Sequence, residues 1–201
     1  MVAALAKDMD VDLQDADDVA LVAALRARDP RAPRVLWERY ATTVYRVLRR
    51  SLGPSSDVED MAQEVFLTVF RKAETIRTPA ALRAYITSVA ALTGRSQLRK
   101  RWVQRWSPNS GTEPAASAPA TEDTDARAAV QRFYALLGRL RPSQRTAFVL
   151  RAMEGLDHAE VAAALGVSLA TAKRWVARAS ARVQLLVDRD PVLVEYLGRA
   201  N

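Results

Sequence analysis

Hydrophobic residues recur at helical spacing along almost the whole of this 201-residue chain. In one segment after another, an apolar residue is followed by the next one three or four positions later, whereas the strict alternation of a strand is rare. Ala, Leu and Arg, which are strong helix formers, are abundant, and the chain has only 7 glycines. This pattern predicts an all-α protein.

Prolines divide the front half of the chain into four predicted helices. Pro30, Pro54 and Pro79 interrupt the apolar pattern, and proline ends a helix because it has no amide hydrogen to donate. We expect helices from Asp18 to about Asp29, over a second segment that closes at Leu52, from Val58 to about Ile76, and from about Ala80 to Trp106.

A segment without periodicity separates these helices from those of the back half. Residues 107–125 are rich in Pro, Ser and Ala and include Gly111, a composition typical of a flexible linker between domains. We therefore expect two small helical domains, at 18–106 and 126–187. An acidic arm at 1–17 is expected to be disordered. Residues 188–201 form a C-terminal extension whose short apolar segment suits one more helix.

The most informative motif is a predicted helix-turn-helix in the second domain. Asp157 and Glu160 have the spacing of a capping box at the start of its first helix. Gly166 stands where the chain must reverse with a positive φ, and Ser168 can cap the second helix. That second helix has one apolar stripe, formed by Ala172, Val176, Ala179 and Val183.

Basic residues of the second helix fall off this stripe. They are Lys173, Arg174, Arg178 and Arg182. An ordinary helical hairpin with a solvated basic face would carry the same residues. The caps, the turn glycine and the small Ala162 at the expected helix crossing together favour DNA binding.

Composition narrows the function further. The formal net charge of +7 and the pI near 10.2 indicate an acidic partner, of which nucleic acid is the commonest. With no cysteine and a single histidine, disulfides and thiolate or His-rich zinc sites are excluded, so we expect neither a metal nor a cofactor. No apolar signal core or membrane span is evident, and we expect a cytoplasmic protein without membrane insertion.

Two charged clusters stand out in the first domain. Polar residues gather in the first turns of the third helix, where carboxylates also suit the helix dipole: Asp57, Glu59, Asp60, Gln63 and Glu64. The end of the fourth helix is basic and interleaved with tryptophans: Arg95, Arg99, Lys100, Arg101, Trp102, Arg105 and Trp106. Such a tail can hold phosphates while a ring stacks on a base. Packing of Trp102 into the core at a solvated helix end fits the pattern equally well.

Three segments together resemble bacterial sigma factors of the extracytoplasmic-function (ECF) type, a sigma-70-like family with only the second and fourth sigma domains. They are Leu36-Trp37-Glu38-Arg39-Tyr40, then Asp57 to Phe70, and Leu140-Arg141-Pro142-Ser143-Gln144-Arg145 with Met153-Glu154-Gly155-Leu156. The resemblance covers nearly all of residues 18–187. It implies a region-two helical bundle followed by a region-four helix-turn-helix, and a protein that is not an enzyme.

This resemblance implies that the third helix binds core RNA polymerase on the clamp helices of the β′ subunit. The matching residues are Asp57, Asp60, Gln63, Glu64, Phe66 and Phe70. An acidic ridge flanked by phenylalanines suits a coiled coil that bears arginines. The β flap of polymerase, promoter DNA and an anti-sigma factor are the other implied partners.

The resemblance also assigns two DNA contacts. At the downstream promoter element, a loop before the fourth helix would take up a flipped base and the helix would hold the strand, through Arg77, Thr78, Tyr85, Arg95, Arg99, Lys100 and Arg101. At the upstream element, the recognition helix would enter the major groove, with Ser168, Thr171, Lys173, Arg174, Ala177 and Arg178 as candidate contacts.

Several residues depart from the family pattern. In the fourth helix Leu92 and Ser96 stand where the family has Asn and Asp, and Tyr85 stands for a tryptophan. In the recognition helix Ala170 and Ala172 replace a glycine and a valine, and Trp175 replaces an arginine. These departures bear on promoter specificity and melting rather than on polymerase binding. For Trp175 we expect core filling in preference to a position toward DNA.

Two other functions fit parts of the sequence. A helix-turn-helix regulator that never engages polymerase would form a dimer on a palindromic site, yet no clear dimer helix is evident. A nuclease could use the carboxylates of the third helix as metal ligands, or Asp157 and His158 as an acid–base pair, but His158 has no second carboxylate cluster near it in the sequence. No GxxxxGK[ST] phosphate loop occurs, which suits DNA opening without ATP.

Overall fold

The computed structural model describes residues 13–55, 57–105 and 124–199, and it is all-α, as predicted. Two short 3-10 turns, at Ala73–Thr75 and Pro79–Ala81, connect α3 to α4. The π-helical turn η3 (Val149–Met153) continues α6. The helices are α1 (Asp18–Arg26), α2 (Ala32–Leu52), α3 (Val58–Arg71), α4 (Leu82–Arg105), α5 (Thr124–Leu137), α6 (Pro142–Phe148), α7 (His158–Leu165), α8 (Leu169–Val187) and α9 (Pro191–Arg199).

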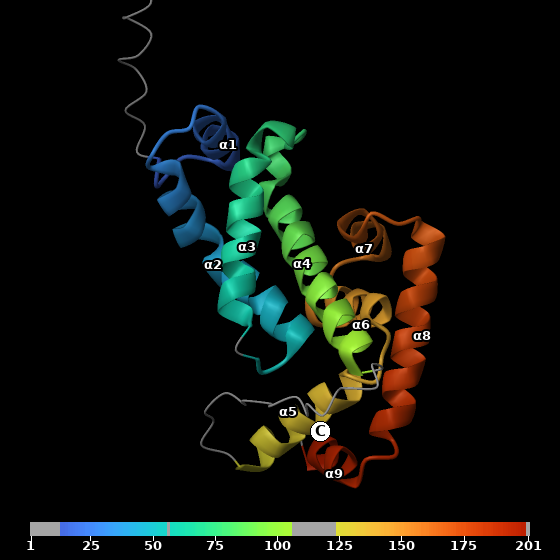
Figure 1. Ribbon diagram of the computed structural model, residues 1–201. Coiled ribbons are helices and arrows are strands. Elements are labelled where there is room, and N and C mark those ends of the chain that lie inside the picture. The colour runs from blue at the N-terminus through green and yellow to red at the C-terminus, as the bar shows by residue number, and fades with distance from the viewer. Residues whose placement is uncertain (1–12, 56, 106–123, 200–201) are drawn as a thin grey trace, which may run out of the picture.

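Helices α1 to α4 form the first domain, a bundle in which α2, α3 and α4 lie side by side (Figure 1). Each long helix buries one apolar stripe, as the 3.6-residue period requires. The largest fully buried side chains of the bundle include Leu36 and Leu48 of α2, Val65 of α3 and Ile86 of α4. Burial of a side chain of this size contributes about 1.5–3 kcal/mol to stability, so these stripes are what hold α3 and α4 in place.

The first domain starts before the predicted boundary at Asp18. The side chain of Asp17 caps α1 by accepting a hydrogen bond from the amide of Ala20 at 2.8 Å. Ala16 is buried, and Arg39 of α2 donates to the carbonyl oxygen of Gln14 at 2.9 Å. Residues 13–17, assigned to the acidic arm from composition alone, therefore belong to the folded domain. The rest of that arm lies outside the described residues.

Two helix ends differ from the pattern-based expectation. The third helix ends at Arg71 rather than near Ile76, because the chain turns to bury Ile76 in the core. Arg26 of α1 fixes that turn by donating to the carbonyl oxygen of Ile76 at 2.5 Å. The fourth helix begins at Leu82, since Pro79–Ala81 forms a separate 3-10 turn before it.

Helices α5 to α9 form the second domain. Helix α8 packs on α6 and α7, with Ala172, Val176, Ala179 and Val183 all buried, which confirms the predicted stripe. The C-terminal extension forms α9, as its apolar segment suggested. Its Leu193 is buried with Leu136 of α5 and Leu186 of α8, so the extension completes a small core around α5.

The two domains are packed against each other. Helix α4 contacts α6 and α7, and a single buried cluster runs from the bundle core to Leu150 and Val161 of the second domain. Helix α4 stands between α3 and α8 in Figure 1, so the two helices expected to bind partners lie on opposite sides of it. Residues 107–123 of the predicted linker lie outside the described residues, and its last two positions, 124 and 125, form the start of α5 instead.

Candidate polymerase and DNA interfaces

The exposed face of α3 is a narrow polar ridge. Asp60, Gln63 and Glu64 are exposed, and Leu67 is 47% exposed. These four residues are spaced i, i+3, i+4 and i+7, so they share one face of the helix. We call them the α3 ridge. Three of them were predicted from the sequence. Leu67 was missed, although its spacing from Asp60 identifies it, and it gives the ridge an apolar anchor at one end.

Phe66 does not flank this ridge as the resemblance suggested. Its side chain is only 2% exposed and its ring lies 4.6 Å, centroid to centroid, from that of Trp37 on α2. Phe70 is half-buried and packs against the same core. Both phenylalanines therefore support the α3 ridge from beneath, by fixing α3 on α2, and Phe66 has almost no surface left for a partner.

Asp57 holds α3 to α4 instead of capping α3. Its carboxylate accepts hydrogen bonds from Arg101 at 2.7 Å and from Gln97 at 2.5 Å, and its side chain makes no capping hydrogen bond. Arg101, a predicted DNA contact, also donates to the hydroxyl of Ser55. Asp57 and Arg101 thus form an ion pair within the first domain. One guanidinium neutralises the carboxylate nearest to the start of α3.

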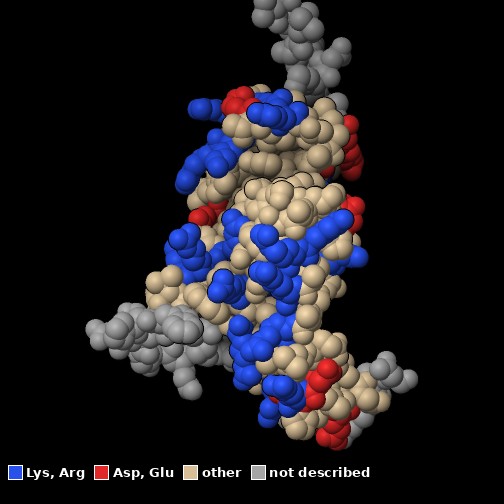
Figure 2. All heavy atoms as spheres, turned by 90° about the vertical axis from the view of Figure 1, so that its right-hand side faces the viewer, with Lys and Arg blue, Asp and Glu red and all other residues tan. Residues whose placement is uncertain are grey.

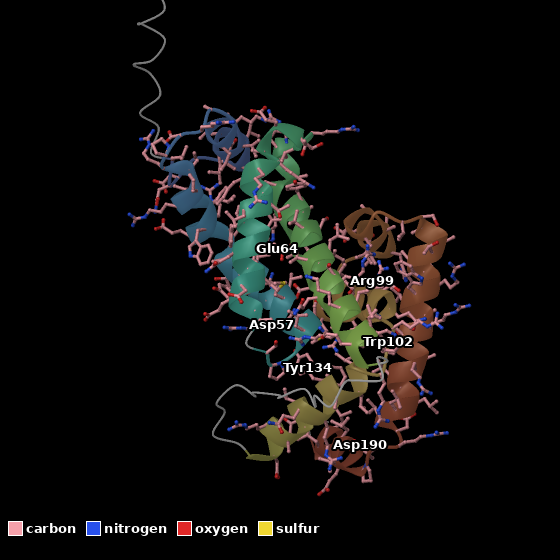
Figure 3. All side chains as sticks on the ribbon, viewed as in Figure 1. Asp57, Glu64, Arg99, Trp102, Tyr134 and Asp190 are labelled. Carbon is pink, nitrogen blue, oxygen red and sulfur yellow. The ribbon has the colours of Figure 1, made fainter. Side chains whose placement is uncertain are left out.

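The remaining predicted downstream-element residues lie around the loop and along α4. Arg77 and Thr78 are exposed immediately before α4, and Tyr85 is half-buried against the core. Farther along α4, Arg99 and Lys100 are exposed and Arg95 is half-buried. Arg99 and Trp102 extend from the side of α4 nearer to the second domain (Figure 3). Trp102 is half-buried, which is compatible with both roles expected from the sequence, packing into the core and stacking on a base.

The helix-turn-helix has the predicted caps. The carboxylate of Asp157 accepts from the amides of Ala159 at 2.7 Å and Glu160 at 2.8 Å, while Glu160 accepts from the amide of Asp157 at 2.7 Å. This is a complete capping box. Gly166 ends α7 in the left-handed region with φ +63°, and Ser168 caps α8 by accepting from the amide of Thr171 at 3.2 Å. Local sequence therefore sets where α7 ends and where α8 begins.

One face of α8 is open and cationic. Lys173, Arg174, Arg178 and Arg182 are all exposed, and we call them the α8 basic face. Figure 2 shows lysine and arginine side chains gathered over this side of the molecule. Ser168 and Ala177 are exposed as well, whereas Thr171 is half-buried. Trp175 is half-buried against the core, which agrees with its expected role as a space filler beside Ala172.

The capping carboxylate gives the second domain a defined pH dependence. Hydrogen bonds from the backbone amides of Glu160 and Ala159 lower the pKa of Asp157 below its ordinary value. A lowered folded-state pKa means that the charge stabilises the fold above the unfolded pKa of about 3.9 and that this contribution disappears as pH falls below it. In Asp157→Asn the cap acceptor remains without the charge, so its melting temperature should lie below that of the wild type at pH 7 and converge with it toward pH 3. A constant difference across that range, or the same convergence in the exposed control Asp15→Asn, would contradict this assignment.

Neither a metal site nor a membrane span is found in the part of the chain that the structure describes. Over residues 13–55, 57–105 and 124–199, no three Asp, Glu or His side chains gather closely enough to hold a metal ion. Among the same residues no helix is both long and apolar enough to cross a bilayer. The carboxylates of α3 are arranged along an exposed ridge and do not converge.

Comparison with known proteins identifies the class of protein. The Sigma-70 region 2 family matches residues 36–104, and the Sigma-70, region 4 family matches residues 130–183. These matches coincide with the first domain and with the helix-turn-helix domain, in the order of a bacterial transcription initiation factor of the sigma type. The chain belongs to the ECF family of RNA polymerase sigma factors.

Individual relatives agree with this assignment. The ferric citrate uptake sigma factor FecI of Escherichia coli is 30% identical over 66% of this chain and 77% of its own length. The ECF sigma factor SigJ of Mycobacterium tuberculosis is 34% identical over 76% of this chain, which spans only 52% of SigJ. The solved structure of the sigma factor RpoE from Bartonella quintana, in complex with the anti-sigma factor NepR, is 25% identical with a TM-score of 0.59. The aligned region covers 76% of this chain and 96% of the RpoE chain.

Proposed function

We propose that this sigma factor binds the β′ clamp helices of core RNA polymerase through the α3 ridge and reads promoter DNA through α8, the loop before α4, and α4 itself. The observation that carries this proposal is the separation of two chemically opposite surfaces. The α3 ridge presents Asp60 and Glu64, and the α8 basic face presents only cations, on opposite sides of α4. An acidic ridge repels DNA and attracts a basic protein surface, whereas a basic helix face does the reverse.

At the upstream element, α8 would lie in the major groove. Its N-terminal half carries the exposed Lys173, Arg174 and Arg178 within about two turns of helix, the region that helix-turn-helix proteins place against base edges. Arginine can bind guanine through two hydrogen bonds, and lysine holds phosphates without reading sequence. The exposed Leu169, at the first position of α8, adds an apolar group that suits a thymine methyl.

At the downstream element, binding energy would open the duplex without ATP. Arg77 and Thr78 are exposed at the loop where a flipped base would enter, with Tyr85 half-buried behind them. Stacking and pocket contacts to an unpaired base offset the few kcal/mol lost with its pairing. Arg99 and Lys100 would hold the phosphates of the separated strand. This account makes the protein a cytoplasmic initiation factor with no catalytic residue and no cofactor.

An anti-sigma factor is a further proposed partner. The relative RpoE was solved with the anti-sigma factor NepR, and it shares the fold of this chain. Such an inhibitor could act by covering the α3 ridge or the DNA-binding surfaces, because these are the surfaces that initiation requires.

Capture of core polymerase by the purified chain tests the proposal against the helix-turn-helix alternative. We expect one chain to bind one core enzyme, and the free chain to sediment as a monomer. A stable dimer that binds a palindromic duplex and leaves core polymerase unbound would support the alternative and overturn the proposal.

A further inference from the structure

A buried glutamate joins the two domains. The carboxylate of Glu154, at the end of η3, accepts hydrogen bonds from Arg46 at 3.1 Å and from Arg50 at 2.9 Å, both on α2. Its side chain is only 5% exposed, and Arg50 also donates to the carbonyl oxygen of Met153. The second domain thus inserts one carboxylate between two arginines of the first, which lie one helical turn apart and can reach it together.

A second contact lies at the same end of α2. Gly53 follows the helix with a φ of +78°, and a Cβ built there would lie 3.0 Å from the ring of Tyr134 on α5. A side chain at Gly53 would push the ring of Tyr134 away by a few tenths of an ångström, and the positive φ also favours glycine there. Burial raises the pKa of the Tyr134 hydroxyl. These two contacts make the interface specific. The contact at Gly53 favours a residue without a side chain, and the contact at Glu154 needs opposite charges.

The charged part of this interface can open at moderate cost, whereas the apolar cluster that runs from the bundle core to Leu150 and Val161 provides the rest of the contact between the domains. Arg46 and Arg50 keep 37% and 35% of their side chains exposed, so water already reaches them. A shallow hollow of about 550 Å³, which Tyr45 and Arg49 also line, keeps this edge of α2 open to solvent. When the domains separate, Glu154 regains its hydration and the arginines lose little, because an ion pair with one exposed side is a reversible contact.

The packed arrangement conflicts with simultaneous binding of two promoter elements. Helix α4 lies directly against α6 and α7, so the surface proposed for the downstream element is next to the domain proposed for the upstream element. The residues between α4 and α5, 106–123, would span at most about 60 Å if fully extended at about 3.3 Å per residue. The covalent connection would therefore let the two domains move apart once the interface opens.

We propose that Glu154 is a latch that holds the two domains together in the free chain and must leave Arg46 and Arg50 before one chain can engage both promoter elements. The requirement that the domains separate for promoter binding rests on the proposed function. The closed state of the free chain does not depend on it. The latch leaves the α3 ridge and the α8 basic face exposed. It therefore restricts the span of the molecule without blocking first contact with either partner.

Distance measurement between the domains tests the latch. The chain has no cysteine, so Ala23→Cys on α1 and Ala181→Cys on α8, both at exposed positions, accept a fluorophore pair without background labelling. We expect a single population at the closed-state distance in the parent chain and an open-to-closed ratio at least about tenfold higher in Glu154→Arg, which corresponds to about 1.4 kcal/mol. The combination Arg46→Glu, Arg50→Glu and Glu154→Arg restores opposite charges and should restore the closed-state distance.

The matched control is Glu38→Arg, which reverses one charge in the exposed pair that Glu38 forms with Arg34 at 2.8 Å. It should leave the distance unchanged. Equal distances in the parent and Glu154→Arg, or no recovery in the charge-swapped triple variant, would overturn the latch. The same proteins assayed in transcription separate the two proposals. A parent chain without sigma activity refutes the proposed function even if Glu154→Arg opens. If the parent chain is active in transcription but the inter-domain distance does not change in Glu154→Arg, the latch is refuted and the proposed function stands.

Discussion

Reversing the charges of Asp60 and Glu64 to arginine is expected to weaken capture of core RNA polymerase by at least about 100-fold, or about 2.7 kcal/mol. Both carboxylates are exposed and share the α3 ridge, so the variant replaces attraction to a basic coiled coil by repulsion. Neither side chain forms a salt bridge within the described residues, and the core beneath them is untouched. Titration of labelled core enzyme with the full chain measures the loss.

The control for this variant is Asp15→Arg with Glu74→Arg, which changes the net charge by the same amount at exposed positions of the first domain outside the α3 ridge. It should bind core polymerase nearly as well as the parent chain. An equal loss in both double variants would mean that overall charge, and not the α3 ridge, governs binding. Leu67→Ala should produce a smaller loss than the charge reversal and no change in salt dependence.

Removing Arg174 and Arg178 together is expected to weaken specific binding at the upstream element strongly while leaving polymerase capture intact. Each arginine that contacts a base contributes about 1–3 kcal/mol, so the double variant Arg174→Ala with Arg178→Ala should lose about 30-fold or more. Fluorescence anisotropy of the full chain on a duplex selected for binding gives the affinity. Repeating it at several salt concentrations separates base contacts from phosphate contacts, because each lost phosphate contact reduces the salt slope by about one.

The exposed Arg127 on α5 provides the matched control, since it carries the same charge in the same domain. Arg127→Ala should change affinity only slightly. A comparable loss for Arg127→Ala, or normal binding by the α8 double variant, would show that DNA does not lie on the α8 basic face.

The parts of the fold that depend on neighbouring residues were predictable from the sequence. The capping box of Asp157 and Glu160, the left-handed Gly166 and the cap at Ser168 are all present as expected, because caps and turns are set by side chains within a few positions. The buried stripe of α8 follows from a periodicity that any core-facing helix must show.

For Phe66 the apolar spacing was the better guide, because Val65, Phe66 and Val69 share the buried stripe of α3, whereas the family resemblance placed Phe66 among the polymerase contacts. Contacts between residues far apart in the sequence were not predictable. Arg101 has an acidic partner 44 positions away, so composition alone presented it as a free cation. The contact of Glu154 with Arg46 and Arg50 joins residues more than 100 positions apart, and no local pattern marks it.

The departures from the family pattern in α4 fall on its surface. Leu92 is 38% exposed and Ser96, one helical turn later, is exposed as well. Neither replacement fills a core position, so the change of Asn to Leu and of Asp to Ser alters what α4 presents to a partner rather than how it folds. We therefore expect these two positions to affect promoter preference and melting, not stability.

The central claim is that one chain binds core polymerase through the α3 ridge and directs the polymerase to promoters through its DNA-binding surfaces. Transcript start-site mapping with purified core polymerase on a library of promoter fragments tests it most directly. The account predicts discrete start sites only when the chain is added, and their loss with the Asp60→Arg, Glu64→Arg variant. Identical transcripts with and without the chain would contradict it.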